Sequence, residues 1–406
     1  LAHADRVEPL QAYCAGLVVP GENKSVEPIA AMTAPSRVSA QHQSLLHFVG
    51  QSSWSDWALM NVAVNYAVQG LEEHGPMERY LVDDTGFPKK GKHSVGVANQ
   101  YCGILGKNAN CQVTVTVSMA NEVGSVPVGV QLYLPKQWAD DPERRKKAKV
   151  PEEMVFAPKW AIALDVLEAH LLDDEREVGA LPVCADAGYG DTKAFRQGLR
   201  DMSLAYTVGV KKSTSVKVLS LESGSKTTRS EYEPGQELLS VKAAAEALPA
   251  GAWQPVSWRE GVGGPLKSRF ALVKVRVKDG YEETHPEDEE ERLLIEWPAS
   301  EPEPTRYWLS TEDLGLPRLV EAAKARWRIE RDYQEMKTNF GLDKYQGRGW
   351  RGFHHHWSLC IAVYAFAVTE RSRFSPLGAL PEIPVRTPGV PGDYRPRGAA
   401  HEARAP

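Results

Sequence analysis

Several features are scarce in this sequence, and each absence excludes a class of protein. The five cysteines are scattered without CxxC spacing, which argues against a zinc site and against a disulfide framework. The most apolar run, Trp357 to Val368, is far shorter than the roughly 20 residues that span a bilayer. The N-terminus lacks a signal-peptide pattern, so we expect a cytoplasmic protein with no membrane partner. Because the sequence opens at Leu1 rather than Met, we also expect residues upstream of it.

A strong excess of one charge is missing as well. The net charge of -5 is not typical of a nucleic-acid-binding protein, but a phosphate-binding surface depends on where the cations lie. Over 321–351 the chain carries eight Lys and Arg against five Asp and Glu, a local excess of 8 − 5 = 3 positive charges. With 406 residues, 42% of them hydrophobic and 25% charged, the chain has the composition of a globular protein with room for more than one domain.

Hydrophobic patterning divides the chain into successive parts. We expect an N-terminal helical region that is a candidate for DNA binding (1–75), the first part of an α/β core (76–210), a β-rich insertion (211–310), the last part of the core (311–372) and a tail (373–406). The tail carries seven prolines in the 31 residues after Ser375 and has little to bury, which predicts disorder.

Period-two alternation and helical spacing give the order of elements in the core. Strands are predicted at 80–82, 111–119 and 126–134 as an antiparallel meander, followed by a helix at 158–172, a strand at 181–185, a helix at 192–200 and a strand at 205–210. One continuous helix is predicted at 313–340, after the β-rich insertion. Strands that alternate with helices in this way indicate an α/β fold.

Charged residues form a row in the predicted helix at 313–340. Arg326, Glu330, Tyr333 and Lys337 share one helical face, because a residue turns about 100° per step. An acid between two cations is unsuited to a buried apolar stripe. It suits a carboxylate that holds a divalent metal while its neighbours bind phosphates. The alternative is an exposed helix with an ordinary i,i+4 ion pair.

Two further acids are predicted at the ends of strands. Asp84 follows the first strand and Asp186 follows the fourth. Each also fits a turn: Asp84 precedes Thr85-Gly86, and Asp186 precedes Gly188 and Gly190. If the first strand lies beside the fourth, these two carboxylates and Glu330 can converge on two metal ions. Carboxylate oxygens suit Mg²⁺, and Mn²⁺ as well.

These segments resemble a known family. Val82-Asp83-Asp84-Thr85, Val183-Cys184-Ala185-Asp186 with Tyr189-Gly190-Asp191, and Arg326-Trp327-Arg328-Ile329-Glu330 with Lys337 are similar to the DDE transposases of bacterial insertion sequences. The group they resemble carries the signature Tyr, two residues, Arg, three residues, Glu, six residues, Lys. Its tyrosine falls on Ala323 here, so the phosphate or base contact of that tyrosine is either absent or supplied by another residue. Over about 75–370 the resemblance implies an RNase H-like mixed sheet with flanking helices and a β-rich insertion before the glutamate.

The resemblance also implies a set of site residues. The metal ligands would be Asp84, Asp186 and Glu330, with Asp84 chosen over Asp83 because the family's aspartate precedes Thr. Phosphate and DNA contacts would come from Arg326, Arg328, Lys337 and the aromatic pair Tyr307 and Trp308, one of which would hold a flipped base. The implied enzyme cuts the terminal inverted repeats of its element and joins them to target DNA, as a dimer in the synaptic complex, in association with the bacterial nucleoid.

Other residues and other functions remain open at this stage. His354-His355-His356 cannot face one ion from a helix, and we interpret them as a basic, partly exposed patch near DNA. Loop lysines are either phosphate contacts or solvated side chains: Lys89, Lys90, Lys92, Lys211 and Lys212. Aromatics that follow the row belong to the core or stack on bases: Tyr345, Trp350, Phe353 and Trp357. The alternatives to a transposase are an RNase H-like nuclease without strand transfer and a domesticated derivative that only binds DNA.

Overall fold

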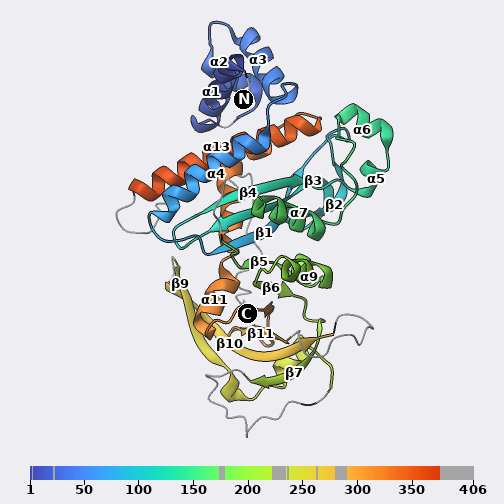
Figure 1. The fold of residues 1–406 in the computed structure, drawn as a ribbon, viewed down its shortest axis with the longest axis vertical. Helices are drawn as coiled ribbons and strands as arrows, with labels where there is room; N and C mark the ends of the chain where they lie inside the picture. The colour runs from blue at the N-terminus through green and yellow to red at the C-terminus, as the bar shows by residue number, and fades with distance from the viewer. Residues whose placement is uncertain are drawn as a thin grey trace, which may run out of the picture.

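The computed structural model describes residues 1, 3–21, 23–172, 179–221, 235, 237–261, 264–278 and 290–374 (Figure 1). The proline-rich segment from Ser375 onward, which is predicted to be disordered, lies outside the described residues. No helix among the described residues is long and apolar enough to cross a membrane, including the 25-residue α13.

Helices make up the N-terminal region, as the sequence predicts. They are η1 (Ala4–Arg6), α1 (Val7–Val18), α2 (Val26–Thr33), α3 (Val38–Gly50) and α4 (Asp56–Glu72). Figure 1 shows α1, α2 and α3 gathered at one end of the molecule, and α4 running alongside α13 (Trp350–Phe374). Ser55 caps α4 by accepting a hydrogen bond from the Ala58 amide, which fixes the start of that helix.

A mixed sheet forms the centre of the molecule. Its strands are β1 (Arg79–Pro88), β2 (Ala98–Cys102), β3 (Lys107–Ala120), β4 (Ser125–Leu132), β5 (Val183–Ala185) and β6 (Tyr206–Val210). β3 pairs antiparallel with β1, β2 and β4, whereas β1 and β5 run parallel to each other. The first strand therefore lies beside the predicted fourth strand, and the expected RNase H-like α/β class with a mixed sheet is confirmed. β2 was not predicted, because its short Ala-Asn-Gln-Tyr-Cys segment has little apolar alternation.

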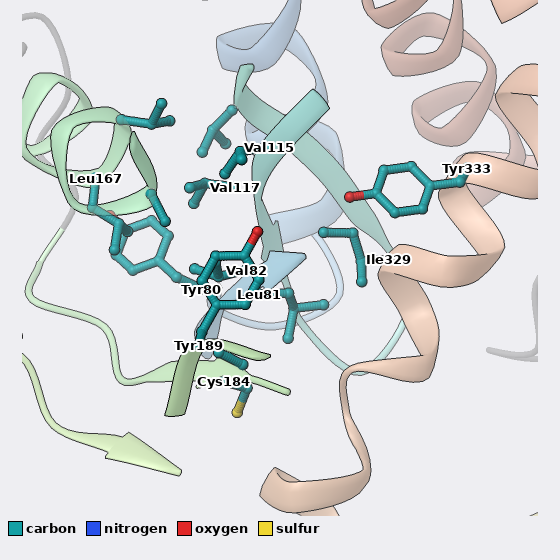
Figure 2. Packing of buried hydrophobic residues seen from close by; sticks show 14 of the residues in the cluster. Tyr80, Leu81, Val82, Val115, Val117, Leu167, Cys184, Tyr189, Ile329 and Tyr333 are labelled. Carbon is teal, nitrogen blue, oxygen red and sulfur yellow. The ribbon is translucent and has the colours of Figure 1, made fainter. Parts of the chain in front are cut away.

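Short helices connect and cover these strands. They are η2 (Gly103–Leu105), α5 (Lys136–Ala139), α6 (Pro142–Ala148), α7 (Lys159–Leu171), α8 (Ala187–Gly190) and α9 (Lys193–Asp201). Figure 2 shows the sheet between two layers, with Leu167 of α7 on one side and Ile329 and Tyr333 of α12 (Trp327–Asn339) on the other. Leu167, Ile329, Val115 and Val117 are fully buried, so the core lies on both faces of the sheet.

The β-rich insertion continues the central sheet. It contains β7 (Ser215–Leu221), β8 (Leu239–Ser240), α10 (Val241–Glu246), η3 (Ala250–Ala252), β9 (Gln254–Gly261), β10 (Gly264–Val277), β11 (Glu290–Trp297) and β12 (Arg306–Ser310). β12 pairs antiparallel with β6, and the order then runs through β11, β10 and β7 to β8. A second apolar cluster lies here, which includes Phe270, Leu294 and Trp308.

The helix predicted at 313–340 is two helices. α11 (Leu316–Lys324) ends before Ala325, and α12 begins at Trp327, followed by η4 (Leu342–Lys344). The break has a physical cause, because the two helices bury their apolar faces in different cores. Leu319 of α11 packs in the cluster of the insertion, whereas Ile329 of α12 packs on the central sheet.

Candidate active site

Two acidic segments lie side by side where the pairing of β1 with β5 stops. The parallel pairing stops at Val82 opposite Ala185, so Asp83 and Asp186 are the next residues on the two strands. Asp186 caps α8 by accepting a hydrogen bond from the Gly188 amide at 2.8 Å. The prediction that Asp84 ends its strand is wrong. β1 continues to Pro88, because it stays paired with β3 after its pairing with β5 has ended. The edge of β1 that faced β5 is therefore unpaired beside the acids.

Asp83 and Asp84 point to opposite faces of the sheet, as successive strand residues must. The Asp83 carboxylate lies 2.7 Å from the Arg326 guanidinium, on the face that α12 covers. The Asp84 carboxylate lies 3.0 Å from Nζ of Lys159, at the start of α7, and accepts a hydrogen bond from the Tyr189 hydroxyl at 3.3 Å. Each aspartate therefore has its own cation.

The predicted charged row faces the sheet. Arg326 pairs with Glu330 at 2.6 Å in addition to its contact with Asp83, so one guanidinium bridges two carboxylates. Lys337 donates to Thr85 Oγ1 at 2.6 Å and to the Gly86 carbonyl at 3.1 Å. The Tyr333 hydroxyl shares a hydrogen bond with Thr116 of β3. The shared face is confirmed, and the alternative of a wholly exposed row is wrong, since only Glu330 is exposed.

Electrostatic strain marks this edge of the sheet. Burial raises the pKa of Asp83 to about 7, against the opposing effect of Arg326, and the negative charges of Asp186 and Asp84 raise it further. Burial also lowers the pKa of Lys337 to about 8. Carboxylates that repel one another at an open strand edge favour the binding of additional positive charge.

The carboxylates fit a divalent cation by chemistry but are not gathered around one position. Asp84, Asp186 and Glu330 offer the oxygen ligands that Mg²⁺ prefers. Within the part of the chain that the structure describes, no three Asp, Glu, His or Cys side chains lie close enough to hold one metal ion. The side chain of Glu330 is 56% exposed and paired with Arg326, and Asp84 is paired with Lys159. A metal would take the place of these internal cations.

Sequence reasoning gives three residues of this site no role: Asp83 is set aside for Asp84, Tyr189 is only part of a motif, and Lys159 is not among the predicted residues. All three contact the charged groups described above. Strand alternation could have found Asp83, because it shares a face of β1 with Thr85 and thus with Lys337. Lys159 and Tyr189 lie 75 and 105 positions from Asp84, and nothing local announces their contact with it.

Three predicted DNA contacts lie elsewhere. Arg328 donates to the Glu122 carbonyl at 2.7 Å, away from the carboxylates. Tyr307 and Trp308 are both buried in β12, where the Tyr307 hydroxyl donates to the Pro304 carbonyl. In this conformation neither ring is open to a DNA base, and the flipped-base role stays a prediction. Ala323, at the position of the signature tyrosine, is buried in the cluster of the insertion.

The histidine prediction is wrong. His354, His355 and His356 are all buried in α13, and each contacts a backbone carbonyl. Burial lowers the pKa of all three, that of His356 to about 4, so they are neutral core residues at pH 7. The neighbouring aromatics Trp350, Phe353 and Trp357 belong to the same core. Of the two roles considered for them, core packing and stacking on bases, the structure shows core packing.

Comparison with known proteins agrees with this geometry. Residues 1–265 match the family described as DDE superfamily endonuclease, and the chain belongs to that family. The match includes Asp84 and Asp186 and ends before Glu330. A relative named "Probable transposase for insertion sequence element IS701", from Microchaete diplosiphon, is 29% identical over 182 residues. That alignment covers 44% of this chain and 43% of the relative, so the chain matches less than half of the relative's length.

Proposed function

We propose that the protein is a transposase that cuts the DNA ends of an insertion sequence and joins them to target DNA. The observation that carries the proposal is the meeting of three elements at one sheet edge. β1 and β5 bring Asp83, Asp84 and Asp186 to one edge of the sheet, and α12 lays Arg326, Glu330 and Lys337 over the Asp83 face of that edge. Family membership and the name of the relative support it.

Asp84, Asp186 and Glu330 would hold two divalent ions, Mg²⁺ or Mn²⁺. When bound, such a pair activates an attacking water or hydroxyl and stabilises the leaving oxygen of a phosphodiester. The protein's own residues do the rest. Arg326 keeps Glu330 beside β1, and Lys337, held by Thr85, presents a charge to a flanking phosphate. Tyr189 orients the Asp84 carboxylate through its hydroxyl.

The partners would be the terminal inverted repeats of the element and its target DNA. We propose a dimer in the synaptic complex, because two ends have to be joined together, and a location at the bacterial nucleoid. In this proposal residues 1–75 contribute to DNA binding, 76–210 and 311–372 form the catalytic core, and 211–310 is the insertion.

Cleavage of a labelled terminal repeat tests the proposal. Purified protein with Mg²⁺ is expected to cut the end, and Asp186→Asn is expected to lose at least about a hundredfold of the rate while still binding the DNA. Cutting by Asp186→Asn at the wild-type rate would contradict the site assignment.

A pre-cut end and a target plasmid separate the alternatives. Joined products are expected from a transposase, whereas a nuclease of the same fold yields only shortened DNA. A domesticated derivative binds the end and gives neither product.

A further inference from the structure

A basic groove lies between the N-terminal helices and the core, away from the carboxylates. Its volume is about 580 Å³, and its walls come from α1 to α3, from the end of α6 and from the segment 344–352 that leads into α13. Figure 1 shows α13 running between α1 to α3 and the sheet, so the groove lies where the two regions of the protein meet. Segments this far apart in sequence form one surface only in the folded chain.

Cations outnumber carboxylates among the residues of this groove, although the ammonium of the buried Lys24 bonds to the Leu17 and Val19 carbonyls at the end of α1. The described residues that line it include six cations, Lys24, Lys147, Lys149, Lys344, Arg348 and Arg351, and one carboxylate, Glu27. The whole chain carries a net charge of -5, so this is a local concentration of positive charge. Lys344 pairs with Asp343 at 3.0 Å, which partly neutralises it.

Two of these cations are positioned by a neutral residue. Lys149 donates to the side-chain oxygen of Gln51 at 3.0 Å, and Arg351 donates to the backbone carbonyl of Gln51 at 3.0 Å. One cation directly follows α6 and the other comes from α13, and both keep their full charge because an amide cannot neutralise them. Lys149 is the left-handed residue (φ = 53°) that ends α6, and its amide bonds back to the carbonyls of that helix, so the helix end fixes its place on the rim.

We propose that this groove binds the phosphate backbone of duplex DNA next to the site of cleavage. The inference rests on the proposed function and adds to it the surface that grips the DNA. Phosphates suit it because its lining offers many donors and a single carboxylate. A volume of about 580 Å³ is too small for a duplex but admits the sugar and phosphates of one strand, with the rest of the duplex lying across the rim.

The groove is joined to the active-site strand. Lys89, just beyond β1, donates to the Tyr345 carbonyl at 2.7 Å, and the Val95 amide donates to the Arg348 carbonyl at 3.1 Å. Lys89 follows Asp84 by five residues, which is roughly 17 Å of extended chain or about five base pairs of duplex. One strand therefore links the wall of the groove to the aspartates of the candidate active site.

The test is a set of variants around Gln51, measured by fluorescence anisotropy on a labelled duplex of about 30 base pairs in EDTA, where no cleavage occurs. Gln51→Glu keeps both cations and gives them a competing carboxylate, so we expect about 3- to 10-fold weaker binding and no loss of thermal stability. The double variant Lys149→Ala/Arg351→Ala is expected to weaken binding at least about tenfold and to lower the slope of log affinity against log salt by about 2.

Matched controls decide the outcome. Lys267→Ala/Lys274→Ala, on exposed positions of β10, should change the affinity less than about twofold, and Gln51→Ala, which loses only the side-chain contact to Lys149, should weaken binding less than Gln51→Glu. Wild-type affinity in the Gln51→Glu and double variants would overturn the groove proposal and leave the transposase proposal intact, if the wild-type protein still cuts its ends. An equal loss in the β10 control, or equal binding to duplex RNA, would also overturn it. If the wild-type protein neither binds nor cuts DNA, both proposals fail.

Discussion

Nζ of Lys159 lies 3.0 Å from Oδ2 of Asp84, where a metal ion would have to bind. The ammonium group thus competes with a metal for one carboxylate. Replacing it with methionine keeps most of the side-chain volume and removes the charge. We expect Lys159→Met to bind Mn²⁺ about 3- to 10-fold more tightly than the wild-type protein in a calorimetric titration.

Two further variants serve as controls for this measurement. Lys193→Met, at an exposed position of α9, should leave the Mn²⁺ affinity unchanged. Asp84→Asn should weaken it, because a ligand is lost. Weaker binding by Lys159→Met would mean that Lys159 orients Asp84 for the metal and does not compete with it.

The pH dependence of DNA binding is expected to reveal Lys337. Burial lowers the pKa of its amine to about 8, with the carboxylates of Asp343 and Asp83 opposing the effect. As the pH rises through 8 the ammonium loses its proton, and its attraction for a phosphate is lost with it. Anisotropy titrations between pH 7 and 9 should therefore show weakening affinity in the wild-type protein. Lys337→Arg should flatten this dependence, because a guanidinium keeps its charge. An unchanged pH profile in this variant would exclude Lys337 as the titrating group.

Acid should destabilise the protein through its buried histidines. Burial lowers the pKa of His356 from 6.5 to about 4, so between these values the unfolded chain binds a proton that the folded chain does not. Stability is therefore fully present above about pH 6.5 and falls as the pH approaches 4, by roughly 3 kcal/mol for this one group. Urea unfolding at several pH values is expected to show the loss in the wild-type protein and a smaller loss in His356→Gln. A DNA-facing histidine would leave stability insensitive to the change.

Features of the core that depend on local sequence patterns were predicted correctly. Features that depend on contacts between residues far apart in the sequence were not. Strand alternation around Val82 and Val117 and helical spacing from Arg326 to Lys337 depend on neighbours in sequence, and both appear in the structure as predicted. The histidines depend on distant carbonyls. His355 contacts the backbone of Val49 and Trp54, which lie some 300 positions away in the sequence. A run of three histidines gives no local signal that they are buried.

The same distinction explains the errors at the site. A periodic row predicts which residues share a helical face, but the break at Ala325 depends on two separate cores that only the folded sheet creates. Lys159 contacts Asp84 because α7 packs on the same sheet, so the pair could not be found by spacing. Contacts within one element could be predicted from the sequence, whereas contacts between elements needed the topology.

Ala323 occupies the position of the signature tyrosine, and restoring that tyrosine is expected to harm the protein. The alanine is 7% exposed and packs in the apolar cluster with Phe270, Leu319 and Trp308. A phenol ring at this position must displace its neighbours, and overpacking of this kind costs about 1–3 kcal/mol. We expect Ala323→Tyr to unfold at a lower temperature than the wild-type protein in a thermal scan, whereas Ala323→Ser, a small change, should unfold close to it. Improved cleavage by Ala323→Tyr with unchanged thermal stability would show instead that α11 can turn this position toward DNA.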